Sequence, residues 1–183
     1  RMENPVFTPA SQWELYGVED PRLTELEGRI YLQYTAYSPR GVRISMASTE
    51  NFFQWERHGV IIPDVDNKDA ALFAEKIAER YVMFHRIEPD MYLAFSEDLR
   101  KWTDFVSIAG PRKDGWDNLK IGVGAPPIKT EFGWLVLYHG VENTPRPTYR
   151  LGFMLLDLEN PRRVLKRSQE PILEPEEEWE IFG

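Results

Sequence analysis

Short runs of apolar, β-favouring residues recur along this chain, and turn residues separate them. A seven-residue run rich in aromatic and branched side chains occurs three times, at residues 29–35, 80–86 and 133–139. Runs of four to seven such residues, bounded by turn residues, predict strands. Helical periodicity is nearly absent, and 14 prolines interrupt the chain too often for long helices. The pattern therefore predicts an all-β protein.

The three runs belong to a longer repeat. With Tyr31, Tyr81 and Trp134 in register, the periods are 50 and 53 residues. Each run is followed by a second strand, a polar turn and a further short strand. A tryptophan follows the turn in the first two copies, Trp55 in the first and Trp102 in the second. Four strands about every 50 residues is the period of a β-propeller blade. A β-sandwich is the weaker interpretation, because it has no reason to repeat a tryptophan, a turn and an aromatic strand at one spacing.

The repeat predicts about three four-stranded blades in one partial propeller domain that spans residues 1–183. The blades are expected at approximately residues 17–66, 67–119 and 120–175. Three blades do not close a ring, because propellers typically have four to eight. We therefore expect the outer blades to be missing, so that the chain is a fragment or the ordered part of a longer protein.

Composition narrows the classes of partner. The net charge of −8 argues against a nucleic-acid binder and against attachment to an anionic membrane surface. There is no cysteine, which excludes disulfides, a thiolate metal site and a cysteine nucleophile, and fits the cytoplasmic location that we expect. No run reaches the roughly 18 apolar residues of a membrane span, and no signal peptide opens the sequence. The six Trp, eight Tyr and ten Phe suit strands and the stacking walls of sugar sites.

Polar residues recur near the start of each predicted blade. Asp20 lies 11 residues before Tyr31, Lys68 lies 13 before Tyr81, and Lys120 lies 14 before Trp134. A second tier follows at the ends of the aromatic strands: His85-Arg86 and Tyr138-His139. One acid among several cations, in a chain of net negative charge, indicates an anionic ligand. Taken singly, each residue also fits a turn, a solvated loop or ordinary core; their recurrence across blades argues against that interpretation.

Glycosidic cleavage is a chemistry that such a set could perform. An inverting hydrolase needs two carboxylates, one to protonate the leaving oxygen and one to activate water. Phosphate is already an anionic nucleophile, so a cationic clamp can replace the second carboxylate. One aspartate among cations is therefore the pattern expected for phosphorolysis. Glu19, Asp69, Glu75 and Asp90 could still supply a base, so the residues alone leave hydrolysis open.

At these residues the sequence resembles glycoside hydrolase family 130, the β-mannoside phosphorylases and related mannosidases with a five-bladed propeller. Nearly the whole chain carries the resemblance in the right order. Its motifs are residues 17–22 (GVEDPR), 68–77 (KDAALFAEKI), 85–87, 116–122, 124–128 (GAPPI), 138–141 (YHGV), 149–152 (YRLG) and 171–173. One departure is Ala74, which stands where the family usually has proline.

The resemblance implies that Asp20 is the catalytic acid, protonating the glycosidic oxygen through a hydroxyl of the mannosyl unit. It implies a phosphate site made of Lys68, Arg86, Lys120, Tyr138 and His139. We also predict that Arg43, His85 and Asp90 contact the substrate. Hydrolytic family members lack much of the basic set, so its presence favours a phosphorylase.

The expected reaction is inverting phosphorolysis of a β-mannoside oligosaccharide to mannose 1-phosphate. Inorganic phosphate is a co-substrate, no metal or other cofactor is expected, and a homo-oligomer is compatible with the sequence. Two alternatives stay open: a propeller glycosidase that uses water on mannosides, arabinans, xylans or fructans, and a non-catalytic carbohydrate-binding propeller.

Overall fold

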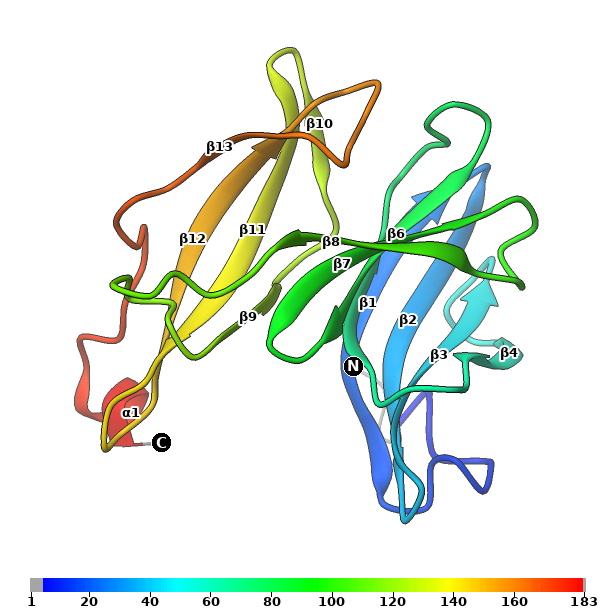
Figure 1. Cartoon of the computed structure of the whole chain (residues 1–183). Helices are drawn as coiled ribbons and strands as arrows, with labels where there is room; N and C mark the ends of the chain where they lie inside the picture. Colours follow the sequence, from blue (N-terminus) through cyan, green and yellow to red (C-terminus); the bar gives the residue numbers. More distant parts are fainter. Residues whose placement is uncertain (1–4, 183) are drawn as a thin grey trace.

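The computed structural model describes residues 5–182 and consists of three antiparallel sheets and one short helix (Figure 1). The first sheet contains β1 (Gly17–Leu26), β2 (Arg29–Ser38), β3 (Gly41–Thr49) and β4 (Glu56–Ile62). The second contains β5 (Lys68–Leu72), β6 (Tyr81–Ile87), β7 (Asp90–Ser96) and β8 (Thr103–Ala109). The third contains β9 (Lys120–Val123), β10 (Ile128–Thr130), β11 (Gly133–Glu142), β12 (Thr148–Leu156) and β13 (Val164–Arg167). Helix α1 (Glu178–Phe182) follows, and nowhere in residues 5–182 is a helix long and apolar enough to cross a bilayer.

The first two sheets are simple meanders, whereas the inner edge of the third is interrupted. Both β9 and β10 pair with β11, with Gly122 opposite His139 and Ile128 opposite Leu135. The segment between them contains Pro126 and Pro127, and proline has no N–H to continue a ladder. Thus β9 and β10 together occupy the place that β1 and β5 occupy in their sheets.

Each sheet packs against the next through the inner strand of the later sheet. Strand β5 contacts β1, β2 and β3, and β9 contacts β5, β6 and β7. The buried core between the first two sheets includes Ile44, Met83 and Trp102, and that between the second and third includes Phe84 and Trp134. This stacking of two four-stranded sheets and one five-stranded sheet confirms the all-β propeller arrangement predicted from the repeat.

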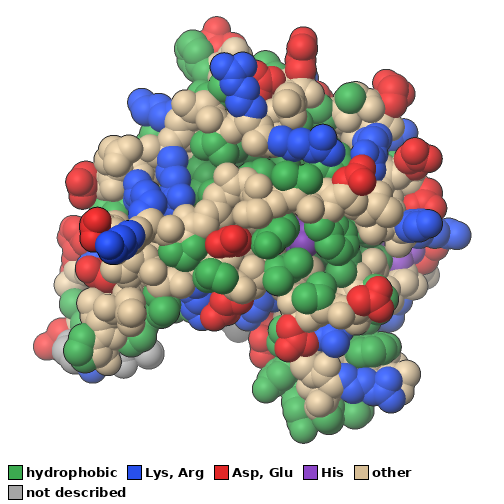
Figure 2. Space-filling model, in the orientation of Figure 1, with side chains coloured by type: hydrophobic (Ala, Val, Ile, Leu, Met, Phe, Trp, Pro, Cys, Tyr) green, Lys and Arg blue, Asp and Glu red, His purple; other side chains and the backbone are tan. Residues whose placement is uncertain are grey.

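The turns that join β2 to β3 and β11 to β12 project from the same side of the molecule, at the bottom of Figure 1. Figure 2 shows a notch between the two projecting lobes, with blue and red charged side chains at its head. Strand β9 lies between the lobes in Figure 1. The inner strands thus lead toward a recess of mixed charge.

Candidate functional site

Two aspartates occupy matching β-bulges in the first and second blades. The register of β1 on β2 shifts after Glu19, and that of β5 on β6 shifts after Lys68. Asp20 and Asp69 follow these positions, with φ of 51° and 55°. Aspartate is one of the few side chains that enter this left-handed region readily. Bulges redirect side chains and are common beside active sites, so each bulge aims a carboxylate out of the regular alternation of its strand.

The carboxylate of Asp20 faces solvent and the second blade. Its Oδ2 lies 3.1 Å from Nζ of Lys68, and the two side chains are 39% and 29% exposed. The guanidinium of Arg22 donates to the Asp20 carbonyl at 3.1 Å, which fixes the bulge from the backbone side. A carboxyl group that is accessible and paired with an ammonium is well placed to meet a substrate.

A second, more buried group surrounds Asp69. Its carboxylate contacts the guanidinium groups of Arg22 and Arg86 and the imidazole of His139. Arg86 continues the chain of contacts to Glu88 at 3.6 Å, and Nζ of Lys120 lies 3.9 Å from the same carboxylate. We call the following residues the inner cluster: Asp20, Arg22, Lys68, Asp69, Arg86, Glu88, Lys120 and His139. The structure thus brings together five residues that the sequence predicted, Asp20, Lys68, Arg86, Lys120 and His139.

The imidazole of His139 is neutral at pH 7. Burial lowers its pKa to about 4, with a further lowering by the positive charge of Arg86 and an opposing effect from Asp69. The ring of Tyr149 lies 5.6 Å from that of His139, and both line a pocket of about 170 Å³ with Leu151 and Leu173. Tyr149 is 54% exposed, so this side of the pocket is open to solvent.

Sequence reasoning missed Arg22, Asp69 and Glu88, which belong to the inner cluster, and Tyr149, which lies beside it. Arg22 reaches across blades and donates to the carbonyls of Val123 and Gly124 at 2.8 and 2.9 Å. The signal for Tyr149 was its place in the 149–152 motif, on the strand that pairs with the one bearing His139. No local pattern distinguished Asp69 from the other carboxylates.

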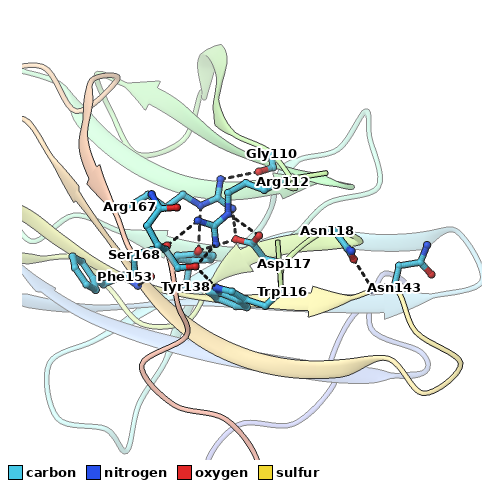
Figure 3. Close-up of polar contacts among 11 residues, drawn as sticks. Gly110, Arg112, Trp116, Asp117, Asn118, Tyr138, Asn143, Phe153, Arg167 and Ser168 are labelled. Carbon is cyan, nitrogen blue, oxygen red and sulfur yellow. Dashed lines mark hydrogen bonds and ion pairs between the residues drawn. The ribbon is translucent and has the colours of Figure 1, made fainter. Parts of the chain in front are cut away.

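The structure places Tyr138, predicted to bind phosphate, away from the inner cluster. Adjacent residues on a strand point to opposite faces, so Tyr138 points away from the face of His139. Its hydroxyl donates to Asp117 Oδ2 at 2.8 Å and accepts from Nε of Arg167 at 3.1 Å (Figure 3). The side chain is completely buried and stacks on Trp116. Tyr138 therefore belongs to the interior of the third blade.

Asp117 is the centre of that interior group (Figure 3). It is completely buried and pairs with Arg112 at 2.9 Å and Arg167 at 2.5 Å. Burial alone would raise the pKa of Asp117, but the hydrogen bonds from Arg112 and Tyr138, together with the positive charges of Arg167 and Arg112, outweigh burial and lower it. The group ties the segment before β9 to β11 and β13, which anchors the strand that carries Lys120.

The three predicted substrate contacts pair with residues outside the inner cluster. His85 is buried, its Nδ1 lies 2.9 Å from the Asn67 amide, and burial lowers its pKa to about 4. It neighbours Arg86 on β6 and points to the opposite face, so the geometry does not support a substrate contact. Arg43 pairs with Asp66, and Asp90 accepts from Ser107 at 3.4 Å; their roles remain predictions.

Neither the inner cluster nor the rest of the described chain contains three His, Asp or Glu side chains grouped to hold a metal ion. The available donors are instead guanidinium and ammonium groups, which suit an anion with several oxygens. A proton donor, Asp20, lies beside them. Together these groups could bind an oxyanion next to a bond that requires protonation.

A propeller whose inner strands carry an exposed aspartate among cations fits the pattern expected of a carbohydrate-active enzyme. The model of the family described as beta-1,4-mannooligosaccharide phosphorylase matches residues 1–183. The chain therefore belongs to glycoside hydrolase family 130, as its motifs indicated.

Relatives and solved structures agree with this assignment. The chain is 45% identical over 186 residues to a 1,2-beta-oligomannan phosphorylase of Thermoanaerobacter sp. (strain X514), covering all of this chain and 62% of that protein. It is 38% identical over 187 residues to a beta-1,2-mannobiose phosphorylase of Listeria innocua, covering 99% of this chain and 52% of that protein. The structure of a Listeria innocua beta-1,2-mannobiose phosphorylase in complex with beta-1,2-mannobiose superimposes with a TM-score of 0.90 at 37% identity, covering 97% of this chain and 51% of that one.

The likeness extends to hydrolases and to a more distant propeller enzyme. A structure reported with GH130 glycoside hydrolases that target beta-1,2 mannosidic linkages in Candida mannan superimposes with a TM-score of 0.92 at 27% identity, covering all of this chain and 61% of that one. The arabinanase Arb43A of Bacillus subtilis has a TM-score of 0.66 at 17% identity over 91% of this chain and 62% of its own, a likeness of fold alone. The chain spans about half to two thirds of the length of these relatives.

Proposed function

We propose that the full-length protein cleaves β-mannosides by inverting phosphorolysis and releases mannose 1-phosphate. The observation that carries this proposal is the grouping of Lys68, Arg86 and Lys120, from the second and third blades, beside the exposed carboxyl group of Asp20. A hydrolase would need a second free carboxylate in place of these cations. The inner cluster holds two further carboxylates, and both are paired: Asp69 contacts Arg22, Arg86 and His139, and Glu88 lies 3.6 Å from Arg86 and 3.9 Å from Lys120.

Inorganic phosphate is the nucleophile in the proposed step. A phosphate oxygen attacks the anomeric carbon from the face opposite the leaving sugar, and the bond from that carbon to the glycosidic oxygen breaks. The carboxyl group of Asp20 supplies the proton that the departing oxygen takes up, by way of a sugar hydroxyl as the family resemblance implies. Inversion converts the β-mannoside into α-mannose 1-phosphate. The cations hold the nucleophile and reduce its repulsion from the Asp20 carboxylate left after proton transfer.

β-1,2-Linked mannosides are the first substrates to test, since two relatives at 45% identity are named for β-1,2 activities. The full-length protein is incubated with β-1,2-mannobiose, with and without inorganic phosphate, and the products are identified by NMR. Mannose 1-phosphate formed only with phosphate is the expected result. Asp20→Asn is the matched control, and it should form neither mannose 1-phosphate nor free mannose in detectable amounts.

Hydrolysis is the second candidate, because a structure reported with β-1,2-mannan hydrolases of the family superimposes on the whole chain. Free mannose as the sole product, at a rate independent of phosphate, would favour hydrolysis and overturn the proposal. Binding of mannosides without release of any product would favour a carbohydrate-binding propeller instead.

A further inference from the structure

Asp69 is the point at which three blades meet. It lies in the bulge of β5, and its side chain is only 4% exposed. Oδ1 lies 3.4 Å from Arg22 of the first blade, and Oδ2 lies 2.9 Å from Arg86 of the second and 3.5 Å from His139 of the third. A buried carboxylate is stable only when it is paired, and here the partners come from three separate sheets.

The contact between Asp69 and Arg86 is made by one nitrogen of the guanidinium group. Nη1 lies 2.9 Å from Oδ2 of Asp69 and 3.5 Å from Nε2 of His139, whereas Nη2 lies 3.6 Å from the carboxylate of Glu88. Oδ2 of Asp69 accepts no well-aligned hydrogen bond from any described residue, so the contact is an ion pair held by charge. Arg86 has five N–H donors and is 6% exposed. Asp69 therefore fixes one side of the guanidinium group and leaves the donors that it does not contact for an oxyanion.

Gly122 permits this meeting of side chains. A Cβ at that position would overlap Oδ2 of Asp69 and lie 2.7 Å from Cε1 and Nε2 of His139. The backbone of Gly122 pairs with His139 in a regular ladder, so the constraint is one of space. Any larger residue must push the Asp69 carboxylate or the imidazole away from their present places.

We propose that Asp69 is a positioning residue for the anion site: it places Arg86 and His139 for phosphate and does not act as acid or base. This inference rests on the proposed function. Without its negative charge, the guanidinium groups of Arg22 and Arg86 have no common counter-charge and move apart, and His139 loses the group that orients its ring. The expected consequence is weaker binding of phosphate, with little change in binding of the sugar.

The test compares Asp69→Asn and Gly122→Ala in the full-length protein. The first removes the charge at constant shape, and the second keeps every charge but displaces the carboxylate. We expect the KM for phosphate to rise roughly 10- to 100-fold in Asp69→Asn, the range for loss of charge-assisted contacts. A rise of about 10-fold is expected in Gly122→Ala, while the KM for the mannoside changes less than about twofold in both.

Asp104→Asn is the matched control, because Asp104 also has a left-handed φ (53°) and an arginine partner, Arg80, at 2.6 Å, but lies on the outer strand β8. Its phosphate KM should equal that of the wild type. Titration calorimetry with inorganic phosphate gives a second measurement that does not need turnover, and circular dichroism confirms that each variant is folded.

The outcomes separate the two proposals. A wild-type protein that neither binds phosphate nor requires it would reject the proposed function, and the role of Asp69 with it. A phosphate-dependent wild type whose Asp69→Asn and Gly122→Ala variants keep the phosphate KM would reject the role of Asp69 alone. Equal rises in both KM values would also reject it, since a general loss of structure predicts that result.

Discussion

Asp20 and Asp69 have the same residue type, the same bulge and nearly the same φ, yet their surroundings differ. The Asp20 side chain is 39% exposed and has one ammonium partner, Lys68, at 3.1 Å. The Asp69 side chain is 4% exposed and is enclosed by two guanidinium groups and an imidazole. The same β-bulge thus presents the Asp20 carboxylate to solvent in the first blade and directs the Asp69 carboxylate into the protein in the second.

The difference teaches that position in the repeat does not set the role of a residue. The bulge supplies only the direction of the side chain, whereas the neighbouring blade supplies the partners. The blade beside Asp20 contributes a lysine that leaves the carboxylate accessible, and the blade beside Asp69 contributes His139 across Gly122. Chemistry is expected at the first bulge and positioning at the second.

The largest expected effect tests the catalytic side of the comparison. Asn tolerates the left-handed φ of position 20, so Asp20→Asn should fold normally while losing the transferable proton. We expect kcat for phosphorolysis to fall by about 10²- to 10⁴-fold, the usual contribution of a general acid. Steady-state kinetics on the full-length protein measure this. If Asp20→Asn retains kcat while Asp69→Asn loses it, the two roles are reversed.

The next effect concerns stability and should be confined to the buried aspartate. Asp69→Asn leaves Arg86, 6% exposed, without its buried counter-charge, and breaking such a pair costs about 3 kcal/mol or more. Asp20→Asn removes only a partly exposed ion pair and should cost less than about 1 kcal/mol. Urea unfolding of both variants gives the comparison, and equal losses would contradict the difference in burial.

Acid should weaken the fold through His139, which belongs to the buried side of the comparison. At pH 5 an unfolded histidine, with a pKa of 6.5, binds a proton that the folded residue, with a pKa of about 4, does not bind. Stability therefore falls as pH drops from about 6.5 toward 4, by about 2 kcal/mol at pH 5 for this group. His85 adds a similar loss, since burial lowers its pKa to about 4 as well.

The variant His139→Gln separates the two histidines in the same titration. It should remove only the part of the loss between pH 7 and pH 5 that belongs to His139, because His85 and His58, whose pKa values burial also lowers, still titrate. Urea unfolding at the two pH values measures this. An unchanged pH dependence would mean that His139 is not shielded by the inner cluster.

A smaller effect concerns the cation that lies farthest from both bulges along the chain of contacts. Lys120 is 23% exposed and only 3.9 Å from Glu88, so Lys120→Met should leave stability within about 0.5 kcal/mol. The phosphate KM should rise about tenfold through loss of one charge-assisted contact. Kinetics at varied phosphate concentration test this, and an unaltered KM would restrict the anion site to the neighbourhood of Lys68 and Arg86.

The smallest effect checks that the buried group of the third blade is separate from both bulges. Tyr138→Phe removes the hydrogen bonds to Asp117 and Arg167 and should cost about 1 kcal/mol of unfolding free energy. The phosphate KM should stay within about twofold of the wild type. A selective rise in that KM would restore Tyr138 as a phosphate ligand.

The fold, and five residues that the structure brings together in the inner cluster, could be predicted from the sequence because both follow the repeat. The aromatic strands and turns recur in register, so blades were predictable, and Lys68 and Lys120 stand at the starts of equivalent inner strands. Arg86 and His139 lie on the equivalent second strands, β6 and β11, of their blades. The features of the site that could not be predicted depend on contacts between blades or on a shift of one residue in the position along a strand.

Tyr138 and Asp69 illustrate what the sequence could not predict. Tyr138 and His139 are neighbours in one apolar run, and composition does not reveal which faces the inner cluster. The aromatic strands of the first two blades are 50 residues apart, whereas the bulge aspartates are 49 apart, so alignment on Tyr31 and Tyr81 sets Asp20 against Ala70. The equivalence of Asp20 and Asp69 became visible only from the backbone.

Because Gly122 must lack a side chain, blades cannot be exchanged freely between propellers of this kind. A propeller invites recombination, since each blade is a compact module joined by short loops. Here a transplanted third blade would need both the glycine and the histidine that faces it, and the receiving blade would need the bulge aspartate. The unit that can be inherited or engineered intact is thus the contact between the second and third blades, formed by Asp69, Gly122 and His139. Chimeras that divide this contact should fold but bind phosphate weakly.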